Sequence, residues 1–296
     1  MKPAMINLNR LSMFVAVVDA GSFTAAADAL GTTKAVVSFN VKQLEQELGV
    51  ALLTRSTRRL ALTQAGEGFH ADCVRLLQDA DAAVDQARSG QAALSGSLRV
   101  TASVDYGNRV VVPALAAFAR LHPALRVGYQ ASSAQADLIG ERLDVAIRVG
   151  ALADSSYRAT RIGEFKLLLV ASPALLAEHG APRSLQALAA LPWLANRPGR
   201  IDPWRLTDSK GRDHAVRVAP VAHADTASAL LAFAEAGCGV AALPDWLLEE
   251  PLARGTLQRV MPSYTLPRQP VHAVYPDTRH VSAKVRRFID FLRTGK

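Results

Sequence analysis

The segment from residue 22 to residue 45 reads as two short helices joined by a tight turn, and it constrains this chain more than any other feature. Ser22 can cap the first helix and Gly31 can end it. Either Thr32 or Thr33 can then accept the free amides at the start of the second helix. These polar side chains predict a helix-turn-helix.

The second helix has two distinct faces. Apolar residues recur at intervals of four, three and four, which places them on one inward face: Val37, Val41, Leu44 and Leu48. Lys34, Ser38 and Lys42 recur at intervals of four on a separate polar stripe. Such a helix fits a DNA major groove and contacts base edges near its amino end. The alternative is a small helical bundle with a solvated face, because helix pairs with short turns are common.

A basic wing is predicted directly after this helix pair. Residues 52–63, LLTRSTRRLALT, read as two short strands around a turn that carries Arg55, Arg58 and Arg59. Arginines at a hairpin tip can reach flanking phosphates or a narrow minor groove. Three arginines alone more often form a solvated loop, but their place after a helix-turn-helix favours DNA contact.

The order FVAVVDAGSFTAAADALGTTKAVVSFNVKQLEQELGVALLTRSTRRLALTQAG resembles the winged helix-turn-helix of LysR-type transcriptional regulators, within about the first 66 residues. The resemblance implies that the start of the recognition helix and the wing approach DNA, at Thr33, Lys34, Ala35, Ser38, Arg55 and Arg58. The residue patterns add Phe39, Lys42 and Arg59. Two positions depart from the family: a basic residue is common in place of Phe39, and phenylalanine in place of Leu53.

Phe39 lies opposite Val37 and Val41 on the helix, so it should be exposed unless another group covers it. Thymine methyl groups are suitable apolar partners for such a ring. The alternative is that Phe39 packs on the wing or on neighbouring side chains and touches no base.

Charge and composition limit how the chain can bind DNA. Residues 1–90 hold nine Lys plus Arg and nine Asp plus Glu, so the net charge of +8 arises from the remaining residues. DNA affinity must therefore come from local clusters rather than from a basic domain. No apolar run approaches 18 residues and no leader-like stretch follows Met1, so we expect a cytoplasmic protein without a membrane span. Cys73 and Cys238 lack metal or disulfide spacing and are expected to be reduced and packed.

A long helix is predicted from Thr63 to Ser89, where proline is absent. Six residues follow a heptad seam along it: Phe69, Cys73, Leu76, Ala80, Ala83 and Ala87. This spacing suits two copies packed side by side, although a helix lying on its own domain would show the same pattern. In the resembled family this helix pairs two DNA-binding domains. A dimer, or a tetramer, would read an imperfectly palindromic operator.

From Leu98 onward the pattern changes to an α/β alternation, which predicts a parallel or mixed sheet covered by helices. The expected strands are LRVTAS, VGYQAS, DVAIRV, KLLLVAS, VRVAPVA, GVAALP and VHAVYP. The expected helices span 113–121, 134–142, 173–179, 226–236, 244–254 and 281–293.

This region is also similar to the effector domain of the same family, which implies two periplasmic-binding-protein-like lobes with a small inducer between them. The expected division is 1–63 for the winged helix-turn-helix, 64–90 for the linker helix and 91–296 for the effector domain. Lobe I is expected over 91–164 and 271–296, and lobe II over 165–270.

Matching motifs predict a cleft wall formed by Ser103, Val104, Tyr106, Ser132, Ser133, Arg148, Val149, Asn196, Asp225 and Thr226. Hydroxyls and free amides at helix starts favour a carboxylate or another small oxyanion. Each serine can instead be a simple helix cap, and Arg148 can instead form a structural ion pair. Trp193, Trp204 and Trp246 are expected to pack rather than to stack on a ligand.

No catalytic, metal or cofactor site is predicted. His223 and Asp225 alone do not indicate a catalytic site. The segment that contains Gly237 and Gly239 lacks the lysine of a phosphate loop. The prediction is a regulator, not an enzyme, with double-stranded DNA, a small effector, further copies of itself and the transcription machinery as partners. The alternative is a cytoplasmic small-molecule-binding protein or a hydrolase whose amino-terminal helices only join subunits.

Overall fold

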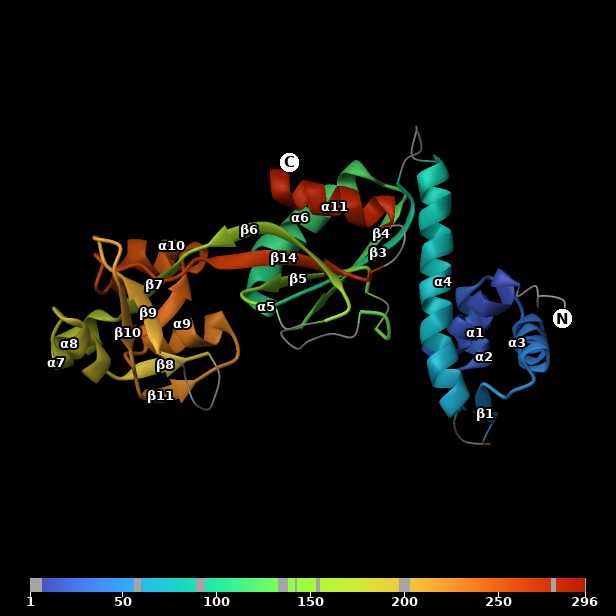
Figure 1. The fold of residues 1–296 in the computed structure, drawn as a ribbon, viewed down its shortest axis with the longest axis horizontal. Helices are drawn as coiled ribbons and strands as arrows, with labels where there is room; N and C mark the ends of the chain where they lie inside the picture. The colour runs from blue at the N-terminus through green and yellow to red at the C-terminus, as the bar shows by residue number, and fades with distance from the viewer. Residues whose placement is uncertain are drawn as a thin grey trace.

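The computed structural model describes residues 7–55, 60–88, 94–132, 138–141, 143–152, 155–196, 203–277 and 281–295. Figure 1 shows a small helical domain, one long helix beside it, and two α/β lobes of which the second lies farthest from the helical domain. The predicted fold class, a winged helix-turn-helix and linker helix followed by a two-lobed α/β domain, is confirmed.

The amino-terminal domain consists of three helices and a hairpin: α1 (Leu8–Ala20), α2 (Phe23–Ala29), α3 (Lys34–Leu48), β1 (Leu53–Arg55) and β2 (Leu60–Leu62). The expected caps form, since the Ser22 hydroxyl accepts the Ala25 amide at 3.0 Å and the Thr33 hydroxyl accepts the Val36 amide at 3.4 Å. β1 and β2 pair antiparallel, as expected for the wing. Among the described residues no single helix is long and apolar enough to cross a membrane, and α1 with α2 meets that test only as a pair bent by 118°.

The linker helix α4 (Gln64–Arg88) starts where the wing ends. The Thr63 hydroxyl accepts the Gly66 amide at 2.9 Å and donates to the Ala51 carbonyl at 2.8 Å, so one side chain fixes both elements. The amino-terminal half of α4 packs on α1 through Phe69 and Phe14, whose ring centroids are 5.9 Å apart. In Figure 1, α4 stands between the other helices of the amino-terminal domain and lobe I.

Lobe I is a mixed five-stranded sheet in the order β4-β3-β5-β14-β6. Its elements are β3 (Gly96–Ala102), α5 (Val104–Tyr106), η1 (Gly107–Val111), α6 (Val112–Leu121), β4 (Leu125–Ala131), β5 (Val145–Val149), β6 (Arg158–Phe165), β14 (Gln269–Tyr275) and α11 (Ala283–Thr294). β3 pairs parallel with β4 and β5, whereas β14 runs antiparallel between β5 and β6. α11 packs on α6 and brings Phe288 to 5.3 Å from Phe118, measured between ring centroids.

Lobe II is built from shorter strands in three small sheets. Its elements are β7 (Leu167–Ala171), α7 (Pro173–His179), α8 (Leu185–Ala190), β8 (Trp193–Ala195), β9 (Trp204–Thr207), β10 (Asp213–Val216), β11 (Pro220–His223), α9 (Ala227–Glu235), β12 (Ala241–Pro244), α10 (Asp245–Arg254) and β13 (Gln258–Arg259). The chain passes from β6 of lobe I to β7 of lobe II at Lys166, and it returns just before Gln269. Two strand connections therefore join the lobes.

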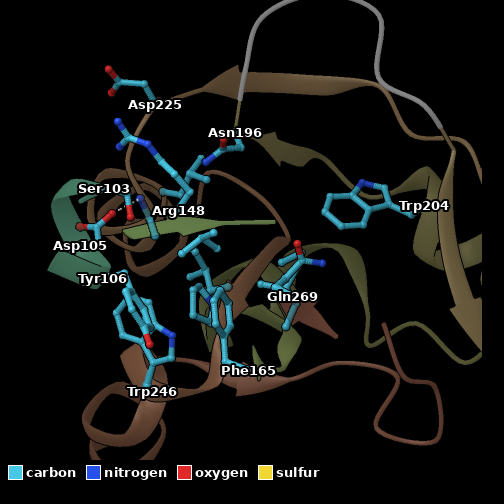
Figure 2. Close-up of a pocket in the computed structure, with 17 residues that line it drawn as sticks. Ser103, Asp105, Tyr106, Arg148, Phe165, Asn196, Trp204, Asp225, Trp246 and Gln269 are labelled. Carbon is cyan, nitrogen blue, oxygen red and sulfur yellow. Dashed lines mark hydrogen bonds between the residues drawn. The ribbon is translucent and has the colours of Figure 1, made fainter. Parts of the chain in front are cut away.

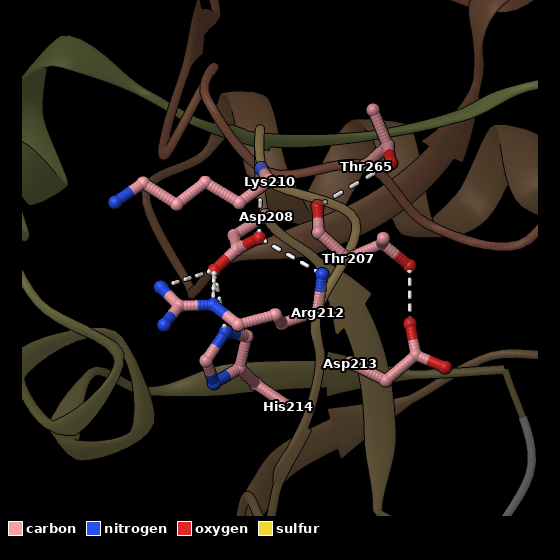
Figure 3. Close-up of polar contacts among 7 residues, drawn as sticks. All are labelled: Thr207, Asp208, Lys210, Arg212, Asp213, His214 and Thr265. Carbon is pink, nitrogen blue, oxygen red and sulfur yellow. Dashed lines mark hydrogen bonds and ion pairs between the residues drawn. The ribbon is translucent and has the colours of Figure 1, made fainter.

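Asp208 holds the β9–β10 hairpin of lobe II closed (Figure 3). One carboxylate oxygen accepts the amides of Lys210 and Arg212, each at 2.9 Å, and the other contacts the Arg212 guanidinium at 2.9 Å and the His214 ring at 3.1 Å. The hydrogen bond from the Arg212 amide, followed by that of His214, holds the pKa of Asp208 well below its usual range. This turn positions β9, the strand that begins at Trp204.

Two sequence expectations for the lobes are wrong. The expected strand 216–222 is two strands, because β10 ends at Val216 in a hairpin with β9 while β11 begins at Pro220 and pairs parallel with β8. Residues 138–141 of the expected helix 134–142 form turns, and the rest of that range lies outside the described residues. The strands β6, β8, β9 and β13 and the helix α8 were not expected.

The contact between α4 and the wing can be tested with two neighbouring glycines. A Cβ at Gly66 would lie 2.1 Å from the Leu52 carbonyl oxygen, whereas a Cβ at Gly68 would meet no atom within 4 Å. Gly66→Ala should lower the free energy of unfolding of the amino-terminal domain by about 1–3 kcal/mol through overpacking. Gly68→Ala should raise it by ~0.5–1 kcal/mol, because alanine favours a helix interior. Denaturant unfolding followed by circular dichroism measures both, and the same sign for both would contradict this packing.

Candidate functional site

The recognition helix α3 presents a sharply divided surface. Val37, Val41 and Leu44 are completely buried against α1 and α2, and Leu48 is partly buried. Thr33, Lys34, Ala35 and Lys42 are exposed, Ser38 is partly exposed, and Phe39 is 61% exposed. The fold therefore leaves the predicted DNA-binding positions of α3, Phe39 among them, accessible to a partner.

Glu45 connects α3 to the wing, a contact that the sequence did not reveal. Its carboxylate accepts the amides of Leu52 and Leu53 at 2.8 and 3.1 Å, so the first wing strand starts at a fixed place beside α3. The backbone of Arg55 pairs with Leu60 at the end of β1. The side chain of Arg55, and Arg58 and Arg59 entirely, lie outside the described residues.

The predicted dimerisation seam of α4 needs correction at its amino-terminal end. Cys73 is fully buried and Phe69 partly buried in the core of their own amino-terminal domain, so these two residues stabilise the monomer. Burial, together with the nearby Asp72 charge, raises the pKa of the Cys73 thiol to about 12. Leu76 is 50% exposed and Ala80 partly exposed, and the side chains of Ala83 and Ala87 lie outside the described residues.

A cavity of 590 Å³ lies between the two lobes. Lobe I contributes residues from α5, β5, β6 and the start of β14, and lobe II contributes residues from β7, β9, α9, β12 and α10. Figure 2 shows that polar side chains gather on one side and aromatic rings on another. A volume of this size is typical of sites for small organic molecules.

Six predicted cleft residues line the cavity: Ser103, Tyr106, Arg148, Val149, Asn196 and Asp225. Three predicted residues do not belong to the described lining, namely Val104, Ser132 and Thr226, and Ser133 lies outside the described residues. The Thr226 hydroxyl caps α9 by accepting the Ala229 amide at 3.3 Å, which is the alternative role considered for such residues. The sequence missed Asp105, Phe165, Leu167, Trp204, Trp246 and Gln269, all of which line the cavity.

Arg148 is the principal cationic group of the cavity wall. One guanidinium nitrogen, Nη1, donates to the Ser132 carbonyl at 2.7 Å, whereas Nη2 is buried without a hydrogen-bond partner. Burial lowers the pKa of Arg148, and the charge of Glu141 partly offsets this effect. Arginine nevertheless stays charged, so Arg148 places a cation in the cavity lining.

Three aromatic rings form the opposite wall, where Trp246 packs as expected and also lines the cavity. Tyr106 and Phe165 stack with centroids 6.1 Å apart, and Trp246 meets their edges at 5.9 and 5.8 Å. The Trp246 indole nitrogen Nε1 is buried and has no hydrogen-bond partner. Trp204 also lines the cavity, and it stacks on the completely buried Trp193 with ring centroids 6.0 Å apart.

Asp105 joins the lobes across the cavity. Its carboxylate accepts the amides of Ala227 and Ser228 at the start of α9, at 2.6 and 3.3 Å. Amides at helix starts were expected in general to favour a ligand oxyanion, but at α9 a side chain of lobe I accepts them. A second contact, between Arg109 of lobe I and Glu249 of lobe II at 3.3 Å, also bridges the lobes.

A helix-turn-helix with a wing, followed by a two-lobed domain with an internal cavity, defines a ligand-responsive DNA-binding regulator. Residues 8–67 match the bacterial regulatory helix-turn-helix protein, lysR family, and residues 91–296 match the LysR substrate binding domain. The chain belongs to the LysR family of transcriptional regulators.

Relatives resemble the chain over nearly its whole length. The transcriptional regulator PtxR of Pseudomonas aeruginosa is 38% identical over 292 residues, which cover 97% of this chain and 92% of PtxR. The solved structure of CrgA, a LysR-type regulator from Neisseria meningitidis, is 32% identical with a TM-score of 0.60 and covers 98% of this chain and 99% of CrgA. The full-length Vibrio cholerae virulence activator AphB is 30% identical with a TM-score of 0.59, over 98% of this chain and 99% of AphB. These relatives are regulators rather than enzymes.

The bridge from Asp105 to α9 can be tested by unfolding measurements. Asp105→Ala should lower the free energy of unfolding of the effector domain by about 1–3 kcal/mol, because two amides are left without a charged acceptor. Asp277→Ala is the matched control, since Asp277 pairs with Arg158 on the exposed surface of lobe I alone. The control should cost less than about 1 kcal/mol. Equal effects of the two substitutions would show that the interlobe bridge adds no stability.

Proposed function

We propose that this regulator binds operator DNA through α3 and the wing as a dimer or tetramer, and that a small carboxylate with an apolar or aromatic part binds in the interlobe cavity. The observation that carries the ligand class is Arg148, a cation in the cavity lining whose Nη1 donates to the backbone carbonyl of Ser132. A guanidinium is a donor only, so the ligand group that it favours is an acceptor. A carboxylate is such an acceptor and also matches its charge.

The two sides of the cavity support an amphipathic ligand. Arg148, Asn196 and Ser103 provide the polar side, and the rings of Tyr106, Phe165 and Trp246 provide the apolar side (Figure 2). A carboxylate paired with Arg148 places the rest of the molecule against the rings. Asp225 is exposed at the cavity wall and can accept a hydrogen bond from a hydroxyl or amino group of the ligand.

On the DNA side the proposed contacts are the exposed positions of α3 together with the wing arginines. The set is Thr33, Lys34, Ala35, Ser38, Phe39, Lys42, Arg55, Arg58 and Arg59. Self-association through α4 is supported by exposed Leu76 and Val84, which are 50% and 46% exposed. The regulator would work in the cytoplasm with the transcription machinery, on an imperfectly palindromic operator.

Ligand binding would act by favouring one arrangement of the lobes. A ligand that contacts both lobes stabilises the lobe geometry in which its contacts are best. The equilibrium between lobe geometries shifts only as far as the ligand's affinities for those geometries differ. The contacts of Asp105 with α9 and of Arg109 with Glu249 are the protein's own contributions to that geometry. A changed lobe geometry then alters the spacing of DNA-binding domains within the oligomer.

The ligand class can be tested by thermal stabilisation of the full chain with aryl and alkyl carboxylates and their matched amides. An acid that binds at a hundredfold excess over its Kd should add about 2.7 kcal/mol of stability. Its amide should bind at least ~10-fold more weakly, because it cannot form the charge-assisted hydrogen bond to Arg148.

Arg148→Gln should weaken acid binding by about 10-fold or more, since it removes the cation but keeps a donor. Arg158→Gln is the control and should bind the acid as the wild type does, because Arg158 pairs with Asp277 on the surface of lobe I and does not line the cavity. The carboxylate assignment would be refuted if the amides bind the wild-type protein as tightly as the acids do. It would also be refuted if the Arg148→Gln protein binds the acids as tightly as the wild type does.

A further inference from the structure

Phe39 is the most exposed aromatic residue in the described part of the chain. It is 61% exposed, and Phe233, at 39%, is the only other aromatic side chain there that falls in the exposed class. Phe39 lies on the side of α3 opposite the buried residues Val37 and Val41. The ring therefore contributes little to the core, and its position in the middle of the recognition surface calls for a partner.

Phe39 does not stand alone on this surface. Ala35 is exposed and Val36 is 40% exposed, and they precede Phe39 by four and three residues, which places them beside it on the helix. We call these three residues the apolar patch of α3. The patch lies within the first six residues of the helix, which is the part that meets base edges in a helix-turn-helix.

The polar side chains next to the patch are less suited than the patch itself to contact base edges. The Asn40 side chain, which is the type that reads adenine, donates its amide to the Val36 carbonyl at 2.9 Å. Lys34 and Lys42 are exposed on the polar stripe beside the patch, so they are placed for backbone phosphates. The recognition surface thus has an apolar patch next to a cationic stripe.

Only one group in the major groove matches an apolar surface of this kind. Each A·T pair presents the thymine 5-methyl group there, whereas G·C pairs present polar donors and acceptors. We propose that the apolar patch of α3 reads thymine methyl groups in each operator half-site, with Phe39 as the specificity-determining residue. The proposal rests on the proposed function, in which α3 enters the major groove.

The size of the effect follows from the burial of one methyl group. Removing it should weaken binding by about fourfold in each half-site, which corresponds to ~0.8 kcal/mol. Because a dimer reads two half-sites, removal of both methyl groups should weaken binding by roughly 15-fold, if the two contributions are independent.

The experiment uses the full chain and a duplex that the protein itself selects from a randomised pool. Each thymine of the selected half-site is replaced in turn by deoxyuridine, which pairs identically but lacks the 5-methyl group. Wild-type protein should lose about fourfold in affinity at one or two thymines and bind the others unchanged. Titrations at low salt keep weak binders measurable, because phosphate contacts are then strongest.

Two variants separate direct contact from an effect of the methyl group on DNA shape. Phe39→Gln should bind thymine and deoxyuridine duplexes equally, because the apolar partner of the methyl group is gone. Phe233→Gln, which changes the other exposed phenylalanine on α9 of lobe II, should keep the wild-type ratio.

Two results would overturn the inference, and a third would contradict the proposed function on which it rests. Tight binding with no thymine to deoxyuridine difference would remove the methyl contact and leave the regulator intact. If Phe39→Gln keeps the wild-type ratio of affinities for the thymine and deoxyuridine duplexes, the methyl group acts without touching Phe39. The difference then comes from DNA shape, or another protein copy covers the apolar patch. Failure to enrich any duplex at low salt would instead contradict the proposed function itself.

Discussion

The packing of one apolar stripe determines what the amino-terminal domain can offer to a partner. Val37, Val41 and Leu44 are fully buried against α1 and α2, and a helix that buries this face must turn its opposite face outward. Rotation of α3 would expose these side chains to water, at a cost of about 1.5–3 kcal/mol for each valine or leucine. The caps at Ser22 and Thr33 fix where the helices begin, and Glu45 fixes the wing beside them. The outward face is thus a consequence of the core.

In the effector domain, the arrangement of the two lobes is set by the few connections and contacts between them. Only two strand connections among the described residues join the lobes, at Lys166 and just before Gln269. Asp105 and Arg109 bridge the remaining distance. Between these contacts lies a cavity whose lining includes the cation Arg148 and comes from both lobes. A ligand in this cavity would add contacts to both lobes, and any preference for one lobe geometry would then become a coupling free energy.

The sequence predicts features that depend on local chemistry, and it fails where distant packing decides. Caps, the stripe of α3 and the β1–β2 hairpin follow from residue type and spacing, so they were predictable. The linker seam was misjudged at Phe69 and Cys73 because heptad spacing does not say whether the same chain or a second copy covers it. Trp204 and Trp246 were missed as cavity residues because an aromatic ring that lines a cavity and one that fills a core look alike in sequence. The strand expected over 216–222 was divided by pairing in two different sheets.

The salt dependence of DNA binding tests the outward face of α3 most directly. Lys34 and Lys42 are both exposed there, and Lys210 is an exposed lysine on the distant hairpin of lobe II. Replacing both Lys34 and Lys42 by glutamine should weaken binding to a selected duplex and reduce the slope of log affinity against log salt by about 0.9 for each phosphate that these lysines neutralise. Lys210→Gln should keep the wild-type affinity and slope. A double variant with wild-type affinity and slope would show that another surface holds the DNA.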